Sequence, residues 1–208
     1  MAITAEKFNQ GMTTQQYIDQ IKVNKQPFMD IYQGVEVPAE ARAVFESQAE
    51  PLRLAIFTAD WCGDAVSTTP AILRLAESTD KIEVKIFNRD DELALTDSYL
   101  PEHRAGTVPV FVVLDSSMKE IAKFIETALS MVPTLDAMEE TIAQETAGES
   151  EANARSAGRG KRTAFRVAHA KEWGNIILNE FSQVVDSGLA LAPEARPAVG
   201  GTKWPPED

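Results

Sequence analysis

A short apolar segment that runs directly into a helical pattern constrains this fold more than any other feature. Residues 52–59 (LRLAIFTA) are almost wholly apolar and end at the turn DWCGD (60–64). After the turn, Ile72, Leu73 and Ala76 recur at helical spacing. The pattern predicts a buried strand that feeds a helix, which is the repeating unit of α/β proteins.

Two further patterns predict the rest of the sheet. Residues 82–87 (IEVKIF) alternate with period two, which is typical of a strand with one wetter face. The apolar run at 108–114 (VPVFVVL) is followed by the turn residues 115–117 and then by 119–125 (KEIAKFI). Two strands separated by such a turn indicate an antiparallel hairpin.

Helical patterns lie between and around these strands. Apolar residues at helical spacing predict helices within 13–45, after residue 64, at 91–100, near 135–142 and around 173–184. Strands that alternate with helices and end in a hairpin indicate an α/β fold. We therefore expect a central mixed sheet, with parallel and antiparallel pairs, flanked by helices.

Composition along the chain predicts five segments. The stretch AGESEANARSAGRG is small and polar, which is typical of a linker, and the proline-rich end predicts a flexible tail. The predicted segments are an N-terminal helical extension (1–38), an α/β domain (39–146), a linker (147–160), a C-terminal helix (161–188) and the flexible tail (189–208).

Charge and composition exclude several classes of protein. The net charge of -12 argues against general nucleic-acid binding, because an acidic surface repels a polyanion. No apolar run approaches the roughly 18 residues of a membrane span, and the first residues lack the pattern of a secretory signal. We expect a cytoplasmic protein with no membrane partner. One cysteine and two histidines without zinc spacing predict no metal site, and nothing indicates a cofactor.

The single cysteine, Cys62, stands where the strand pattern gives way to the helix pattern. Backbone N–H groups and the dipole at a helix N-terminus stabilise the thiolate, which is the reactive form of cysteine. An inert, buried small residue is the plainer interpretation of a lone cysteine. The neighbours Trp61 and Gly63 favour the reactive interpretation, because core packing alone does not require them there.

The chain resembles the thioredoxin superfamily at two segments. FTADWCGD (57–64) resembles the active-site turn of that family, and Pro70 matches the proline that kinks the active-site helix. GTVPVFVVLD (106–115) resembles the segment that carries the family's cis-proline. The resemblance covers about residues 39–146 and implies a thioredoxin-like fold. The flanks are similar to those of bacterial thioredoxin-family proteins that add helices at both ends.

The resemblance also implies roles for individual residues. Cys62 takes the position of the nucleophile, and Pro109 that of the cis-proline. Val108, just before it, would pair through its backbone with the substrate chain. Trp61 and Gly63 would shape the docking surface.

Two departures from the family pattern exclude a dithiol reductase that works alone. The position of the second cysteine holds Ala65, and Ile56 stands where thioredoxins commonly bury an acid. The two changes are consistent, since a buried carboxylate without a resolving thiol would only carry a desolvation cost.

The charged residues near Cys62 leave alternatives open. Asp60 and Asp64 raise the pKa of a nearby thiol while the helix end lowers it, so the sequence does not fix the direction. Asp64 is either an ordinary first-turn acid or a group for proton transfer or substrate selection. His103 and Arg104 could approach Cys62 from the loop before Pro109. Residues 152–171 hold six basic residues and no acidic one, which suits a solvated helix face or an anion site.

These observations lead to two hypotheses of function. The first is a thioredoxin-like monothiol oxidoreductase in which Cys62 forms mixed disulfides that an external thiol resolves. Its partners would be protein or low-molecular-weight thiols and disulfides, and its oligomeric state is left open. The second is a binding or scaffold module that keeps the fold without redox chemistry.

Overall fold

The protein is built around a mixed sheet that the sequence patterns predict. In the computed structural model, which describes residues 2–201, the five strands have the order β2–β1–β3–β4–β5. Neighbours β1–β2 and β4–β5 are parallel, whereas β1–β3 and β3–β4 are antiparallel. The strands are β1 (Leu52–Thr58), β2 (Ile82–Asn88), β3 (Val110–Leu114), β4 (Glu120–Ile125) and β5 (Ala198–Gly201).

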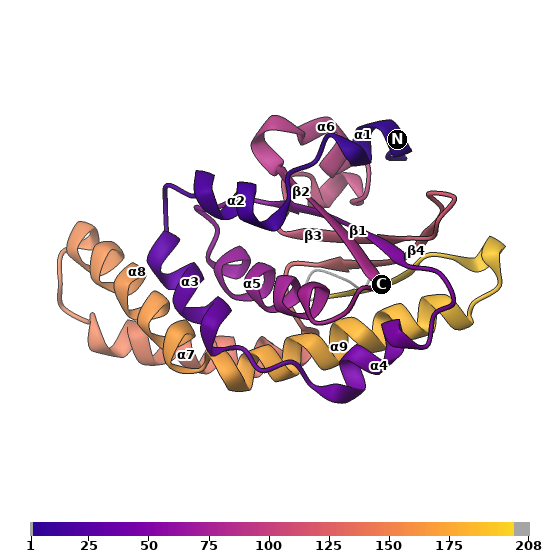
Figure 1. Cartoon of the computed structure of the whole chain (residues 1–208). Helices are drawn as coiled ribbons and strands as arrows, with labels where there is room; N and C mark the ends of the chain where they lie inside the picture. The colour runs from indigo at the N-terminus through magenta and orange to yellow at the C-terminus, as the bar shows by residue number, and fades with distance from the viewer. Residues whose placement is uncertain (1, 202–208) are drawn as a thin grey trace.

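Helices cover both faces of the sheet (Figure 1). They are α1 (Ala5–Asn9), α2 (Thr14–Gln20), α3 (Lys25–Gly34), α4 (Ala39–Glu46), α5 (Gly63–Glu77), α6 (Leu93–Asp97), α7 (Val132–Glu145), α8 (Glu151–Ala168) and α9 (Ala170–Ala190). Short 3-10 turns lie at Arg89–Asp91, Glu102–Arg104, Leu129–Met131 and Pro193–Ala195. The fold is α/β and thioredoxin-like, with helical extensions at both ends of the chain.

The alternation of side chains along each strand divides the core into two clusters. On β1, Leu54 and Ile56 join the larger cluster, which lies under α5 and α9, while Ala55 and Phe57 join the smaller one with Phe8 of α1. All four of these β1 residues are nearly inaccessible to solvent. A strand buried on both faces is apolar throughout, which is why residues 52–59 show no alternation.

Local chemistry fixes where several elements begin and turn. Thr13 and Gln16 form a reciprocal capping box at the start of α2, in which each side chain accepts from the other's backbone N–H. In the β3–β4 hairpin, the carboxylate of Asp115 accepts hydrogen bonds from the N–H groups of Ser117 and Lys119, at 2.8 and 3.0 Å. This turn holds the antiparallel pair that the sequence predicts.

The linker predicted at 147–160 is wrong, because most of it is helical. Residues 151–160 form the first half of α8, an 18-residue helix whose N-cap, Ser150, accepts a hydrogen bond from the N–H of Asn153. Gly158 lies buried where α8 meets α7, and a Cβ there would lie 3.4 Å from Ile142. Packing on α7 therefore stabilises a helix that the small, polar residues of this segment do not predict.

The C-terminal segments also differ from the prediction. Residues 161–188 belong to two helices, α8 and α9, which meet at His169. Of the predicted flexible tail, residues 198–201 form β5 and pair in parallel with β4. Residues 189 and 190 end α9, Pro193–Ala195 form a 3-10 turn, and residues 202–208 lie outside the described residues. Within residues 2–201, no helix has the length and apolar character needed to cross a bilayer.

Candidate functional site

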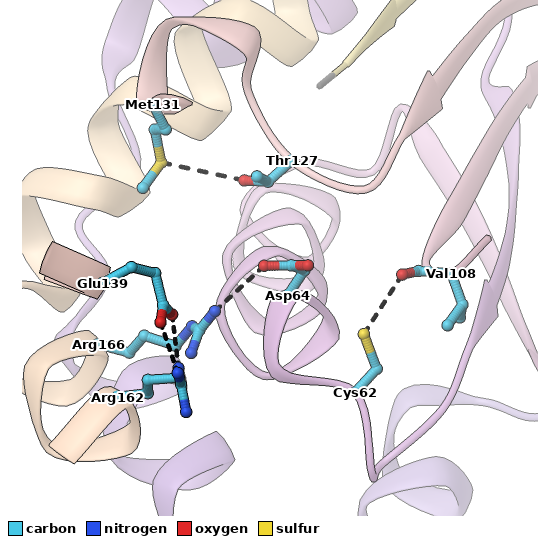
Figure 2. Close-up of polar contacts among 8 residues, drawn as sticks. All are labelled: Cys62, Asp64, Val108, Thr127, Met131, Glu139, Arg162 and Arg166. Atoms are coloured by element: carbon cyan, nitrogen blue, oxygen red, sulfur yellow. Dashed lines mark hydrogen bonds and ion pairs between the residues drawn. The ribbon is translucent and has the colours of Figure 1, made fainter. Parts of the chain in front are cut away.

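Cys62 caps the N-terminus of α5, immediately after the turn that follows β1. Its thiol donates a hydrogen bond to the carbonyl oxygen of Val108, with a sulfur–oxygen distance of 3.3 Å (Figure 2). The side chain is partly accessible. The fold thus brings together the two segments, 57–64 and 106–115, that the sequence singles out.

Val108 and Pro109 form the second wall of the site. The peptide bond between them is cis, which is the geometry that the resemblance implies for this proline. Both side chains are buried, and β3 begins directly after them. The carbonyl oxygen of Pro109 accepts a hydrogen bond of 2.8 Å from the N–H of Glu126, which follows the end of β4. The backbone beside the thiol is therefore fixed by the sheet.

Trp61 is the large exposed side chain of the turn. Its side chain is 51% accessible, and the indole nitrogen donates a hydrogen bond of 2.8 Å to Asp90. Asp60 points elsewhere: its carboxylate accepts from the N–H groups of Lys22 and Val23, at 2.8 and 3.0 Å. Asp60 therefore fixes the segment between α2 and α3 to the turn that holds Cys62. The indole of Trp61 remains accessible to a docked molecule.

Asp64 forms an ion pair that sequence reasoning did not find. Its carboxylate lies 3.1 Å from the guanidinium of Arg166, which reaches across from α8 (Figure 2). Arg166 is only 8% exposed. A Cβ on residue 63 would lie 3.2 Å from that guanidinium, so Gly63 lets the arginine approach the start of α5. Of the two interpretations offered for Asp64, neither anticipated this partner.

The comparisons with known proteins agree with this geometry. The thioredoxin family model matches residues 11–142, well over half of the 208 residues. The chain belongs to the thioredoxin family. The match includes the Cys62 turn and Pro109 and stops before α8 and α9, so Arg166 lies outside it. No curated protein sequence matches the chain.

Two solved structures share the fold of this thioredoxin-family chain. A protein of unknown function from Pseudomonas aeruginosa is 19% identical, with a TM-score of 0.56, covering 81% of this chain and 99% of the other. An HIV epitope-scaffold is 16% identical, with a TM-score of 0.57, covering 90% of this chain and 98% of the other. Both alignments cover more of this chain than the residues that the family model matches.

The environment of Cys62 raises the pKa of its thiol. Burial of the sulfur is the largest cause, and the backbone N–H groups of Ala65 and Asp64 act in the opposite direction. The carboxylates of Asp64 and Glu126 raise the pKa further, because a second negative charge nearby is unfavourable. The direction that the sequence left open is thus upward, and the resting side chain is a thiol.

Glu126 is a second site residue that the sequence analysis missed. It follows β4 directly and has a positive φ of 64°, which marks a sharp turn rather than an ordinary strand end. His103 and Arg104, the two residues that could approach Cys62 from the loop before Pro109, lie in the 3-10 turn Glu102–Arg104. The charged groups that shift the pKa of the thiol are the carboxylates of Asp64 and Glu126.

The positions of the second cysteine and the buried acid are filled by apolar side chains. Ala65 and Ile56 are 2% and 0% exposed. Within residues 2–201, no three His, Cys, Asp or Glu side chains gather as metal ligands do. The chemistry that the site offers is therefore that of one thiol beside a fixed backbone carbonyl.

Proposed function

We propose that this thioredoxin-family protein exchanges thiols and disulfides through Cys62 alone. The observation that carries the proposal is the position of the sulfur, 3.3 Å from the Val108 carbonyl oxygen and beside the cis Val108–Pro109 bond. An extended substrate that paired with the backbone of Val108 would bring its sulfur to Cys62. Trp61, Gly63 and Asp64 would form the rest of the docking surface, with Pro109 beneath it.

The reaction needs two steps and an external thiol. The Cys62 thiolate attacks one sulfur of a substrate disulfide, so that a Cys62–substrate disulfide forms and the other half leaves as a thiolate. The leaving thiolate takes up a proton equivalent to the one that Cys62 lost. An external thiolate then attacks the substrate sulfur of the mixed disulfide, which releases Cys62 and forms a new disulfide. A reducing, cytoplasmic location would supply such thiols.

One specific observation favours the second candidate function, a redox-inactive module. Burial and two carboxylates raise the pKa of Cys62, and a smaller thiolate fraction slows nucleophilic attack. A redox-inactive binding or scaffold module would tolerate this, together with Ala65 and Ile56. The two candidates differ in one measurable property, which is the formation of a mixed disulfide.

Trapping of that mixed disulfide tests the proposal. The reduced protein is incubated with oxidised glutathione at pH 7 and pH 9, and the intact mass is followed with time. We expect one adduct per chain, formed faster at pH 9 because the thiolate fraction rises with pH. The Cys62→Ser protein serves as the control and should stay unmodified. A wild-type chain that gains no adduct when folded at pH 9, yet reacts when unfolded, would favour the binding module.

The Glu126→Gln substitution should make Cys62 more reactive. Removing this carboxylate removes one of the charges that raise the pKa of the thiol, so the thiolate fraction at pH 7 increases. We expect alkylation by iodoacetamide to be about twofold to threefold faster, since the charge is partly screened by water and salt. Glu120→Gln, at the far end of β4, is the matched control. Equal rates in the two variants would contradict an electrostatic effect of Glu126 on Cys62.

A further inference from the structure

A cationic pocket lies beside the turn that holds Cys62, in a protein whose net charge is -12. It encloses about 790 Å³ between α7, α8 and the start of α5. Trp61 and Gly63, the residues on either side of Cys62, belong to its wall. A volume of this size suits a small molecule rather than a folded partner.

One stripe of α8 supplies the positive charge. Arg155, Arg159, Arg162 and Arg166 follow one another at intervals of four, three and four residues, so they share one face of the helix. All four line the pocket, against the carboxylates of Glu139 and Glu151. With Asp64, which pairs with Arg166, these carboxylates leave one of the four positive charges uncompensated.

The pairing of these arginines shows which of them are available to a ligand. Arg162 and Arg155 are engaged by Glu139 and Glu151. Arg159, in contrast, is exposed and forms no ion pair with another residue in the range 2–201. An unpaired cation in the wall of a pocket attracts anions.

Arg166 gives a second and independent indication of a ligand. This side chain is 8% exposed, and only one of its nitrogens is paired, with Asp64. Its Nε is buried and has no hydrogen-bond partner among residues 2–201. A buried donor without a partner carries a free-energy cost, which a bound anion or its hydration shell would relieve.

We propose that this pocket binds the acidic group of a low-molecular-weight thiol or disulfide whose sulfur reacts at Cys62. The inference rests on the proposed function and names its substrate class. Figure 2 shows Arg162 and Arg166 on one side of the start of α5, Cys62 on the other, and Asp64 between them. A flexible ligand lying across Gly63 joins the two sides. Because α8 lies outside the region matched by the family model, this subsite is an addition to the family domain.

The test compares disulfides that differ in charge but react by the same chemistry. Adduct formation at Cys62 is timed with oxidised glutathione, which carries carboxylates, oxidised coenzyme A, which carries phosphates, and cystamine, which carries amines. We expect the two acidic disulfides to react faster than cystamine, with an advantage that decreases as salt is added. The faster of the two acids identifies the anionic group that the pocket prefers.

Variants on α8 assign the effect to the pocket. Arg166→Gln removes the buried partner of Asp64 and can disturb folding, so the decisive substitution is Arg159→Gln, at an exposed position. We expect it to slow the acidic disulfides about twofold to fivefold, the range of one exposed ion pair, and not to slow cystamine, because losing a cation weakens the repulsion of its ammonium groups. Lys161→Gln is the matched control, because it removes the same charge from the same helix outside this pocket. Equal rates for the two variants with every disulfide would overturn the proposal.

Direct binding separates this proposal from the proposed function. If no disulfide reacts with the wild-type protein, thiol exchange is excluded, and binding of S-methylglutathione and coenzyme A to the Cys62→Ser protein is measured by calorimetry. Binding that weakens on Arg159→Gln would support the pocket without redox chemistry. No binding would overturn the pocket. Adducts that form at rates independent of Arg159 would leave the exchange function standing and overturn the subsite.

Discussion

The Phe181→Ala protein is expected to be about 3–5 kcal/mol less stable than the wild type, which is the usual cost of removing a fully buried phenylalanine. Phe181 projects from α9 and is 1% exposed. Its ring lies 5.6 Å from that of Phe124 on β4 and 6.2 Å from those of Phe111 on β3 and Phe45 on α4. Truncation would leave a cavity that rigid strands cannot close.

This prediction tests whether α9 is part of the domain core or is only attached to its surface. The sequence predicts a helix attached to the family domain, whereas the structure places α9 against both β4 and β5. Gly188 brings the two backbones together, since a Cβ at this position would lie 2.1 Å from the carbonyl oxygen of Ile121. We therefore expect α9 to unfold together with the sheet.

Urea unfolding followed by circular dichroism measures the effect. We expect the midpoint to fall by about 1–2 M, as the slope for a domain of this size implies. Leu191→Ala, just beyond α9 and 37% exposed, is the control and should cost less than about 1 kcal/mol. If both variants unfolded with the same midpoint, α9 would be peripheral to the domain core.

Strand positions were predictable because a strand that is buried on both faces is apolar at successive positions, which is visible in the sequence. Each β3 side chain lies in the core, so apolar residues follow one another without interruption, and Asp115 marks the turn that ends the strand. Residues 151–160, which were predicted as linker, show no such pattern for the helix that they form. Glycine and small polar residues favour loops locally, whereas in the structure this helix packs on α7 and buries Gly158 there. The local sequence pattern does not reveal tertiary packing of that kind.

The residues of the candidate site also differ in whether local sequence could predict them. Cys62, Val108 and Pro109 lie within two segments whose motifs resemble the family, so their positions could be predicted from the sequence. Arg166 could not, because its contact with Asp64 spans 102 residues and depends on the placement of α8. The basic residues of 152–171 were visible in the sequence and left an anion site open beside a solvated helix face, but the pocket that the arginines line depends on how α7, α8 and the start of α5 pack together.

The Ala65→Cys substitution should nearly abolish the mixed disulfide that the wild-type protein forms. Residue 65 lies in the first turn of α5, three positions after Cys62, and its backbone N–H already points at the sulfur. The introduced thiol would attack the Cys62 sulfur of the mixed disulfide, form an intramolecular disulfide and release the external thiol. A tethered thiol acts at an effective concentration on the order of millimolar or more, far above that of an external thiol at micromolar concentration. We expect at least about tenfold less adduct, with a chain mass lower by two hydrogens.

The Ala65→Ser protein separates this chemistry from the effect of a larger buried side chain. Residue 65 is 2% exposed, and serine fills nearly the same space as cysteine without a thiol, so the adduct at Cys62 should persist. An Ala65→Cys protein that kept its adduct as long as the serine variant would show that the two side chains do not meet. In that case Ala65 would not be the vacant position of a resolving cysteine. A prompt internal disulfide, in contrast, would show that the site of this protein lacks only the second sulfur, and that the external thiol of the proposed mechanism performs its role.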